Sequence, residues 1–406
     1  MTGFGPLQGL RVLDLTQVLA GPFCTQVLAD LGADVVKVES PETGDMSRQS
    51  GPFHPADKEM VDAGYFHSVN RNKRSIIVDL KTQDGQQLLK SLVPSFDVLV
   101  ENFRVGVMDG FGLSYEALAC ECPKLVYAAI RGFGDPRSGA SPYVNWPAFD
   151  VVAQAMGGIM GITGPDSSHP TKIGPGVGDT IPGLYLGIGI LSAVLRARQT
   201  GRGQFVDVSM VDAILGVCER IVHQRSFGGI IAGPEGNHHP MVAPFGLYPA
   251  KDGAVSLACP SDKFFRELCI RLDAPELANE PAFREQKSRR AHRKAIIAAI
   301  EKITVNFTKA ELKARLGGHI PFGPVYNMAE IAEDPHFEIR GMLPEIECPT
   351  IPGKLRIAGV PIKLSETPGK VARRGPYRGE HTDEVLNDAG FSVEQIDGWR
   401  AAGVVK

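Results

Sequence analysis

The sequence lacks the patterns that point to metal, disulfide or nucleic-acid chemistry. Its seven cysteines are an odd number, spread from Cys24 to Cys348, with no CxxC pair and no histidine at metal-ligand spacing. This usage is typical of reduced thiols in a cytoplasmic protein, so we expect no metal. The formal net charge is only −3, which leaves no broad basic surface for nucleic acid.

Long apolar runs are also scarce. The first residues, MTGFGPLQGLRVLDL, show no basic segment followed by an apolar one, and no unbroken apolar run approaches about 18 residues. We therefore expect neither a signal peptide nor a membrane span. A chain of 406 residues, 43% of them hydrophobic, is long enough for two or three packed domains.

Four common catalytic or nucleotide-binding motifs are missing as well. The turn after the first expected strand, TQVLAGPF, has Gly21 alone where a dinucleotide-binding loop has three glycines. Neither GxxxxGK[ST] nor HExxH occurs, and no GxSxG marks a serine hydrolase. The nearest local pattern is Gly-Val-Gly-Asp at 176–179, which places Asp179 where that motif has its nucleophile.

Short β-branched runs alternate with helical patterns through the first half of the chain. This alternation predicts a parallel, doubly wound α/β sheet. The expected strands are residues 10–15, 33–40, 74–81, 97–102, 124–132 and the start of 205–213. Helices are expected over 23–32 and 85–93, and an almost wholly apolar helix over the segment that follows Gly183.

The second half of the chain changes character after residue 224. A Gly- and Pro-rich stretch, 225–246, leads into an expected strand–turn–strand over 246–259, and mainly helical patterns follow. We predict a large Rossmann-like domain over 1–224, completed by 346–406, and a smaller α+β domain over 225–345.

Asp179 allows two interpretations from its surroundings, GPGVGDTIPG. It suits a helix N-cap, because Thr180-Ile181-Pro182 resembles a first helical turn. It also suits a nucleophile, since the positive end of the helix would favour the carboxylate and the glycines would admit a substrate. The number of glycines before Asp179 favours the second interpretation.

Basic residues near the ends of predicted strands suit a phosphorylated ligand. These are Lys73, Arg74, Lys81 and Arg104. The basic cluster KSRRAHRK (287–294) is more typical of a solvated helix start. The pair His238 and His239 lies in a Gly/Pro-rich loop, where a surface role competes with contact to a substrate anion.

Several long segments, in order, resemble the class III CoA transferases of the formyl-CoA:oxalate and carnitine type, which share their scaffold with α-methylacyl-CoA racemases. These segments are LDLTQVLAGPFCTQVLADLGADVVKVESPETGD, NRNKRSIIVDLK, VENFRVGVMDGFGLSYE, GDTIPGLYLGIGILSAVLRARQTGRGQFVDVSMVDA and GEHTDEVL. The resemblance implies a Rossmann-like domain plus a small domain, an interlocked homodimer, and Asp179 as the nucleophile. Coenzyme A is then a substrate, and no cofactor is expected.

The resemblance also assigns ligand contacts. It implies that CoA lies along Gln17, Val18, Leu19 and Ala20, along Val78 to Lys81, and along Asn102, Phe103 and Arg104. Asp150 and Gly178 would support Asp179, and Phe149, His238 and His239 would meet the acid substrate. The expected partners are an acyl-CoA and a small carboxylic acid, with no nucleic acid and no membrane.

The activity this implies is CoA transfer from an acyl-CoA, with succinyl-CoA as a candidate donor, to a short dicarboxylic or branched acid. Aspartyl anhydride and aspartyl-CoA intermediates would conserve the thioester energy. Racemases of this scaffold have a histidine where Phe149 stands, which disfavours that alternative. Leu19, Phe149 and the loop 236–246 depart from the oxalate-type pattern. A non-catalytic acyl-CoA-binding protein is the remaining alternative.

Overall fold

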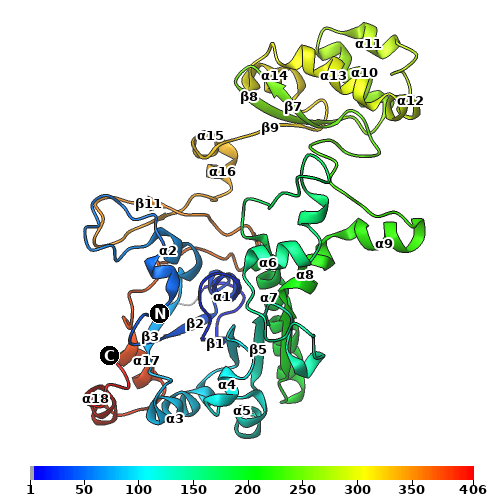
Figure 1. Ribbon diagram of the computed structural model, residues 1–406. Coiled ribbons are helices and arrows are strands. Elements are labelled where there is room, and N and C mark those ends of the chain that lie inside the picture. The colour runs from blue at the N-terminus through cyan, green and yellow to red at the C-terminus, as the bar shows by residue number, and fades with distance from the viewer. Residues whose placement is uncertain (1–3) are drawn as a thin grey trace. The chain divides into compact units, whose positions relative to one another are not determined.

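The computed structural model of the protein describes residues 4–406, and its contacts divide the chain into two compact units (Figure 1). The first unit contains the described residues up to Ile159, together with Ile173–Val222 and Pro335–Lys406. The second contains Met160–Lys172 and His223–Asp334. The chain therefore leaves the first unit twice, and its C-terminal residues complete that unit.

A six-stranded parallel sheet forms the centre of the first unit, in the spatial order β3-β2-β1-β4-β5-β6. This confirms the predicted parallel α/β architecture. The strands are β1 (Arg11–Asp14), β2 (Asp34–Glu39), β3 (Arg74–Ile77), β4 (Val98–Glu101), β5 (Val126–Arg131) and β6 (Phe205–Ser209). Nearly every side chain of the four inner strands is buried, because helices cover both faces.

Two groups of helices cover the sheet (Figure 1). One face carries α1 (Ala20–Asp30) and α7 (Val177–Thr200), which pack side by side. The opposite face carries α3 (Gln83–Leu92), α5 (Tyr115–Glu121), α17 (Thr382–Asp388) and α18 (Val393–Ala401). The unit also contains α2 (Gly64–Asn70), α4 (Val107–Gly110), α6 (Asp150–Met156), α8 (Met210–Val217), α16 (Pro335–Ile339), β10 (Glu345–Ile346) and β11 (Leu355–Arg356).

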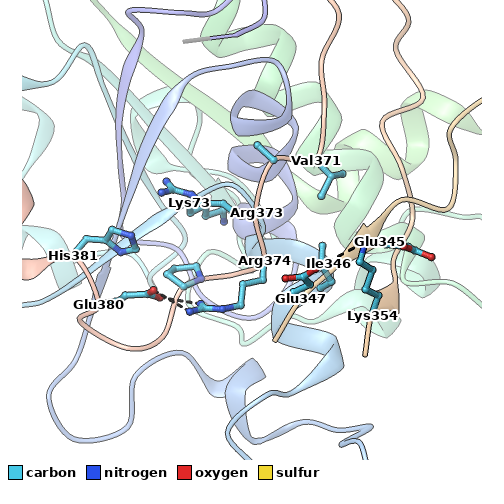
Figure 2. A pocket seen from close by; sticks show the side chains of 12 residues that line it. Lys73, Glu345, Ile346, Glu347, Lys354, Val371, Arg373, Arg374, Glu380 and His381 are labelled. Carbon is cyan, nitrogen blue, oxygen red and sulfur yellow. Dashed lines mark hydrogen bonds and ion pairs between the residues drawn. The ribbon is translucent and has the colours of Figure 1, made fainter. Parts of the chain in front are cut away.

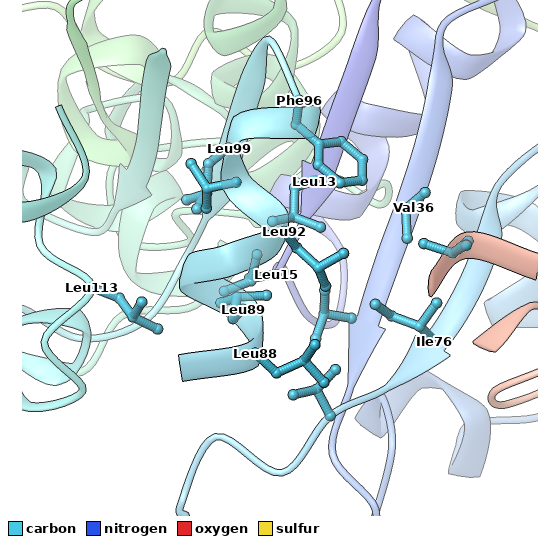
Figure 3. Close-up of a cluster of buried hydrophobic side chains, with 14 of the residues drawn as sticks. Leu13, Leu15, Val36, Ile76, Leu88, Leu89, Leu92, Phe96, Leu99 and Leu113 are labelled. Atoms are coloured by element: carbon cyan, nitrogen blue, oxygen red, sulfur yellow. The ribbon is translucent and has the colours of Figure 1, made fainter. Parts of the chain in front are cut away.

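The main hydrophobic core lies between the sheet and the second group of helices. Figure 3 shows Leu13, Val36 and Leu99 of the strands facing Leu88 and Leu92 of α3. Val385, Leu386 and Ile396 of the two C-terminal helices join the same core. Burying a side chain of this size contributes about 1.5–3 kcal/mol, so the C-terminal residues are an integral part of the first unit.

Helix α7 is long and apolar enough, by length and composition alone, to cross a membrane, with a mean hydropathy of 1.5. The sequence predicts this almost wholly apolar helix after Gly183, but glycines and two arginines keep it from forming an unbroken apolar run of about 18 residues. Its buried residues, among them Leu186, Ile190 and Ala193, pack in the first unit, as a core helix of a globular protein does.

The second unit has its own antiparallel sheet and core. Strands β7 (Phe245–Ala250), β8 (Gly253–Ala258) and β9 (Phe322–Pro324) are covered by Phe265, Leu268, Ile296 and Ile300 of the helices. Its helices are α10 (Asp262–Arg271), α11 (Pro275–Asn279), α12 (Gln286–Ala291), α13 (Arg293–Thr304), α14 (Lys309–Leu316) and α15 (Met328–Glu333), while α9 (Glu219–Gly228) spans the boundary between the units.

Candidate active site

A cavity of about 240 Å³ opens beside the carboxyl ends of β1 and β4. The strand order reverses between these two neighbours, which is where open α/β sheets bind ligands. The cavity is lined by Gln17, Val18, Leu19, Ala20, Met46, Asn102, Phe103, Arg104, Val105, Ile130, Arg131, Gly132, Val144, Trp146, Pro147, Ala148, Phe149, Asp179 and Met210.

Most of the residues predicted for CoA meet Asp179 and Phe149 in this cavity. Val78 and Lys81 lie outside it: Val78 is buried in the core, and Lys81 is exposed and paired with Glu42 at 2.7 Å. Gly178 precedes Asp179 in the chain, and its amide N donates a hydrogen bond to the Asp150 carboxylate. His238 and His239 belong to the second unit, where His238 lines a separate cavity with Tyr248 and Glu301.

The loop 16–19 is held in a strained shape. Val18 has φ of 69°, a left-handed conformation that β-branched residues rarely adopt. The Asn102 side chain accepts from the Gln17 amide N at 2.9 Å and donates to the Gln17 carbonyl at 2.9 Å. Asp45 accepts from the Val18 amide N at 3.2 Å, and buried Lys37 pairs with Asp45 at 2.7 Å. Asn102 thus acts through the loop as a positioning residue.

Replacing Asn102 by alanine should therefore raise the KM for the ligand of this cavity about tenfold, with a smaller change in kcat. Both hydrogen bonds to Gln17 are lost, and each is worth about 0.5–1.5 kcal/mol. Steady-state kinetics measures the split, with Asn387→Ala, at an exposed position, as the matched control. An unchanged KM would contradict the positioning role.

Asp179 is the third residue of α7, so the expectation that it caps this helix is wrong. The helix begins at Val177, and its N-cap is Gly176, which has no side chain to cap with. The Asp150 carboxylate of α6 instead accepts from the Gly178 amide N at 2.8 Å. Asp150 supplies the missing cap, and the Asp179 carboxyl is left to line the cavity.

Two glycines near Asp179 serve helix packing. A Cβ on Gly178 would lie 2.4 Å from the Asp150 carbonyl oxygen, and one on Gly183 would lie 2.7 Å from that of Ala20, so both allow α7 to approach its neighbours closely. A Cβ on Gly174 would have open space around it, and one on Gly176 would meet the Leu19 side chain of the cavity at 2.9 Å. For these two glycines, room for a substrate stays a prediction.

A buried glutamine fixes the segment that leads to Asp179. Gln154 is fully buried, and its Nε2 donates to both Asp150 carboxylate oxygens, at 2.8 and 3.0 Å. Its Oε1 accepts from the Ile173 amide N at 2.9 Å. Gln154 thus couples α6 to a glycine-rich segment that has few side chains of its own to hold it.

Burial, and after it the charge of the neighbouring Asp150, raises the pKa of Asp179 to about 7. The helix N-terminus favours the carboxylate but does not outweigh these two effects. About half of the Asp179 carboxyls are then ionised at neutral pH. A desolvated carboxylate of this kind is a stronger nucleophile than a solvated one.

Replacing Asp150 by asparagine should move the acid limb of the pH profile of kcat/KM to lower pH. The amide oxygen still accepts from Gly178, but the like charge is gone, so the pKa of Asp179 falls. Because burial is the larger cause, the limb should remain above the ordinary carboxyl range. A limb that does not move would show that Asp179 does not titrate in this profile.

Two of the basic residues predicted for a phosphorylated ligand have structural roles instead. Buried Lys73 pairs with Asp14 at 2.9 Å, and Arg74 pairs with Asp34 at 2.6 Å and with Asp388 at 2.9 Å. Lys73 precedes β3 and Arg74 is its first residue. The amino end of this strand lies at the sheet edge opposite the ligand-binding edge. Arg104 lines the cavity, and among the described residues it forms no ion pair.

Sequence patterns did not single out Tyr65 of α2. Burial, followed by the charges of Asp179, Asp45 and Asp150, raises the pKa of its phenol to about 12. Trp146, missed as well, stands against Tyr143 with ring centres 4.7 Å apart and lines the cavity. No local pattern marks either residue.

Comparison with known proteins gives consistent matches over nearly the whole chain. The profile of CoA-transferase family III matches residues 7–382. A succinyl-CoA:mesaconate CoA-transferase of Haloarcula marismortui is 45% identical, covering 96% of this chain and 98% of its own. A succinate–glutarate CoA-transferase of Agrobacterium fabrum is 37% identical, covering 94% and 95%. The crystal structure of a CAIB/BAIF family protein from Brucella suis superposes with a TM-score of 0.85 at 37% identity, covering 95% of this chain and all of that one.

Proposed function

Because the chain belongs to CoA-transferase family III, we propose that it moves CoA from a dicarboxylic acyl-CoA, with succinyl-CoA as donor, to a second short dicarboxylic acid. The observation that carries this proposal is Asp179, a desolvated carboxylate in a cavity lined by Gln17–Ala20 and Arg104. The names of the relatives, which pair succinyl-CoA or succinate with mesaconate or glutarate, support the substrate class.

The proposed reaction proceeds through Asp179. Its carboxylate oxygen attacks the thioester carbonyl, the C–S bond breaks, and CoA leaves as a thiolate with a mixed anhydride on Asp179. The thiolate then attacks the aspartyl carbonyl, which releases the donor acid and leaves an aspartyl-CoA thioester. The acceptor carboxylate repeats both steps in reverse, so the thioester energy is conserved and Asp179 is regenerated.

CoA itself would lie at the mouth formed by the loop 16–19 and Asn102–Arg104. The N-cap of α1, Leu19, makes no side-chain cap, so amides of the first turn remain available to a phosphate. Arg104 would pair with a second phosphate. Trp146 offers an apolar wall beside the reacting end of the cavity.

The acceptor acid would contact Phe149, which is 58% exposed at the cavity. We retain His238 and His239 as weaker candidates for its second carboxylate. The His239 Nδ1 accepts from the amides of Met241 and Val242, at 3.1 and 3.2 Å, which orients its imidazole ring. Burial lowers the pKa of His238, which favours its neutral form.

We also propose that the protein is a homodimer. An apolar row on α7 remains exposed in the single chain, with Leu184, Tyr185, Ile188 and Leu195 between 42% and 63% accessible. An exposed row of this length is typical of a subunit interface. Sedimentation should give twice the chain mass of 43.7 kDa, and a species of that mass alone would refute the dimer.

The transfer is tested with a matrix of donors and acceptors. Succinyl-, acetyl- and formyl-CoA are each incubated with mesaconate, glutarate, citramalate, oxalate and a monocarboxylate, and the new acyl-CoA is identified by mass spectrometry. The highest kcat/KM is expected for succinyl-CoA with a dicarboxylic acid of four or five carbons. If the protein binds CoA but transfers it to none of these acids, the proposed activity is refuted and the protein is a non-catalytic acyl-CoA-binding protein.

A further inference from the structure

Three potential metal ligands meet inside the first unit, away from the Asp179 cavity. One ligand atom each of Asp62, His67 and Cys348 lies within 4.8 Å of the others, and all three residues are buried. Cys348 lies 281 residues from His67, so no spacing motif in the sequence marks the cluster. None of the three lines the candidate active site.

The distances within the cluster are close to those of a tetrahedral zinc site. The Asp62 Oδ1 lies 2.9 Å from the His67 Nε2, and the Cys348 Sγ lies 3.8 Å from the same nitrogen. Bonds of about 2.0–2.3 Å to Zn²⁺ at tetrahedral angles separate such N, O and S atoms by about 3.3–3.6 Å. Shifts of a few tenths of an ångström would therefore bring the three atoms into coordination.

Metal binding requires the protons of the cluster to rearrange. The Asp62 Oδ1 accepts from the His67 Nε2 at 2.9 Å, so the imidazole proton lies on that nitrogen, and the buried Nδ1 has no hydrogen-bond partner among the described residues. Removing the thiol proton without a compensating cation would leave two negative charges buried together, which is costly.

Neighbouring hydroxyl groups hold the Asp62 carboxylate in place. Thr350 and Tyr377 donate hydrogen bonds to the Asp62 Oδ2, Tyr377 at 3.3 Å, which leaves Oδ1 for a metal ion. Two arginines whose charges act on His67 are themselves compensated, because Arg48 pairs with Glu39 at 2.7 Å and Arg374 pairs with Glu380 at 2.9 Å.

An entry path lies beside the cluster. A cavity of about 410 Å³ is lined by Ile346 and Glu347, which directly precede Cys348, and by Arg374 (Figure 2). Figure 2 shows Glu345 and Glu347 beside Lys354, which pairs with them at 3.5 and 3.9 Å. The cavity therefore gives solvent a route toward the segment that carries Cys348, without concentrating negative charge there.

We propose that Asp62, His67 and Cys348 bind one Zn²⁺ ion, with a water as fourth ligand. On binding, the thiol releases one proton to solvent, and the imidazole proton moves from Nε2 to Nδ1. The ion ties the segment before α2 to the segment after β10, which are far apart in the chain. Its role is to stabilise the first unit, and it takes no part in the proposed CoA transfer.

The test uses the full-length enzyme, stripped of metal with a chelator and then titrated with Zn²⁺ against a chromophoric competitor. We expect one Zn²⁺ per chain, with a dissociation constant below about 1 μM. Titration with Co²⁺ should give the near-ultraviolet absorption of a thiolate–cobalt bond. Zn²⁺ should also raise the melting temperature of the stripped protein.

Cys348→Ser should lose the thiolate–cobalt absorption and bind Zn²⁺ at least 100-fold more weakly. Cys120→Ser, at an exposed cysteine, should behave as the wild type. If Cys348→Ser does not fold, Asp62→Asn replaces it in the same zinc competition. Absence of the sulfur absorption from wild-type protein, or equal zinc affinity in wild type and variant, would overturn the proposal. Neither readout depends on CoA transfer, so the two proposals can fail separately.

Discussion

Replacing Asp179 by alanine is expected to lower the rate of CoA exchange by at least about 10⁴-fold. Every covalent step of the proposed reaction forms or breaks a bond to this carboxyl, and loss of a nucleophile typically removes most of the rate enhancement. No other carboxylate lines the cavity among the described residues, so no neighbour can replace it. Exchange is measured as transfer of CoA from succinyl-CoA to a dicarboxylic acid.

The dissociation constant of CoA shows whether the alanine variant is inactive because it lacks the nucleophile or because its binding site is disrupted. The residues proposed to hold CoA, Gln17–Ala20 and Arg104, are untouched by the substitution, so the dissociation constant of CoA should change less than about threefold. Asp84→Asn, which alters an exposed carboxyl, should retain full activity. Wild-type enzyme incubated with acyl-CoA and hydroxylamine should carry a hydroxamate on Asp179. Normal turnover of the alanine variant would refute the mechanism.

Local hydrophobic patterns were sufficient to predict most of the first unit. All six parallel strands lie within the predicted runs, because buried strands between two helical layers are rich in β-branched residues. The boundaries were less accurate. The strand predicted over 74–81 ends at Ile77, and the helix predicted over 23–32 begins at Ala20. Ends depend on capping and tertiary contacts, which a local pattern does not contain.

The candidate site was predictable only in part. Gln17 and Asn102 follow strands that the sequence reveals, Asp179 lies in the first turn of α7, and the three line one cavity. Lys73 and Arg74 were misplaced because they stand at the amino end of their strand. The role of Gln154 could not be found, since its contact with Ile173 is created only by the folded chain.

Replacing Asp179 by asparagine is expected to stabilise the protein while it inactivates it. The folded pKa of about 7 lies above the ordinary value of 3.8, so the unfolded chain loses this proton at lower pH than the folded one. Stability therefore falls as pH rises between these two values and stays low above the higher. The full difference is equivalent to about 4 kcal/mol, and partial exposure of the side chain reduces the expected gain to about 2 kcal/mol at pH 8.

Urea unfolding at a series of pH values measures this effect. The asparagine variant should gain free energy of unfolding over wild type as pH rises from about 4 to about 7, and the gain should be constant above that range. Asp84→Asn should show no such gain. A gain that does not vary with pH would contradict the raised pKa. The free energy needed to bury the ionised Asp179 carboxylate also favours catalysis. The first covalent step converts this carboxylate into a neutral anhydride, which relieves the destabilisation that folding imposes on it.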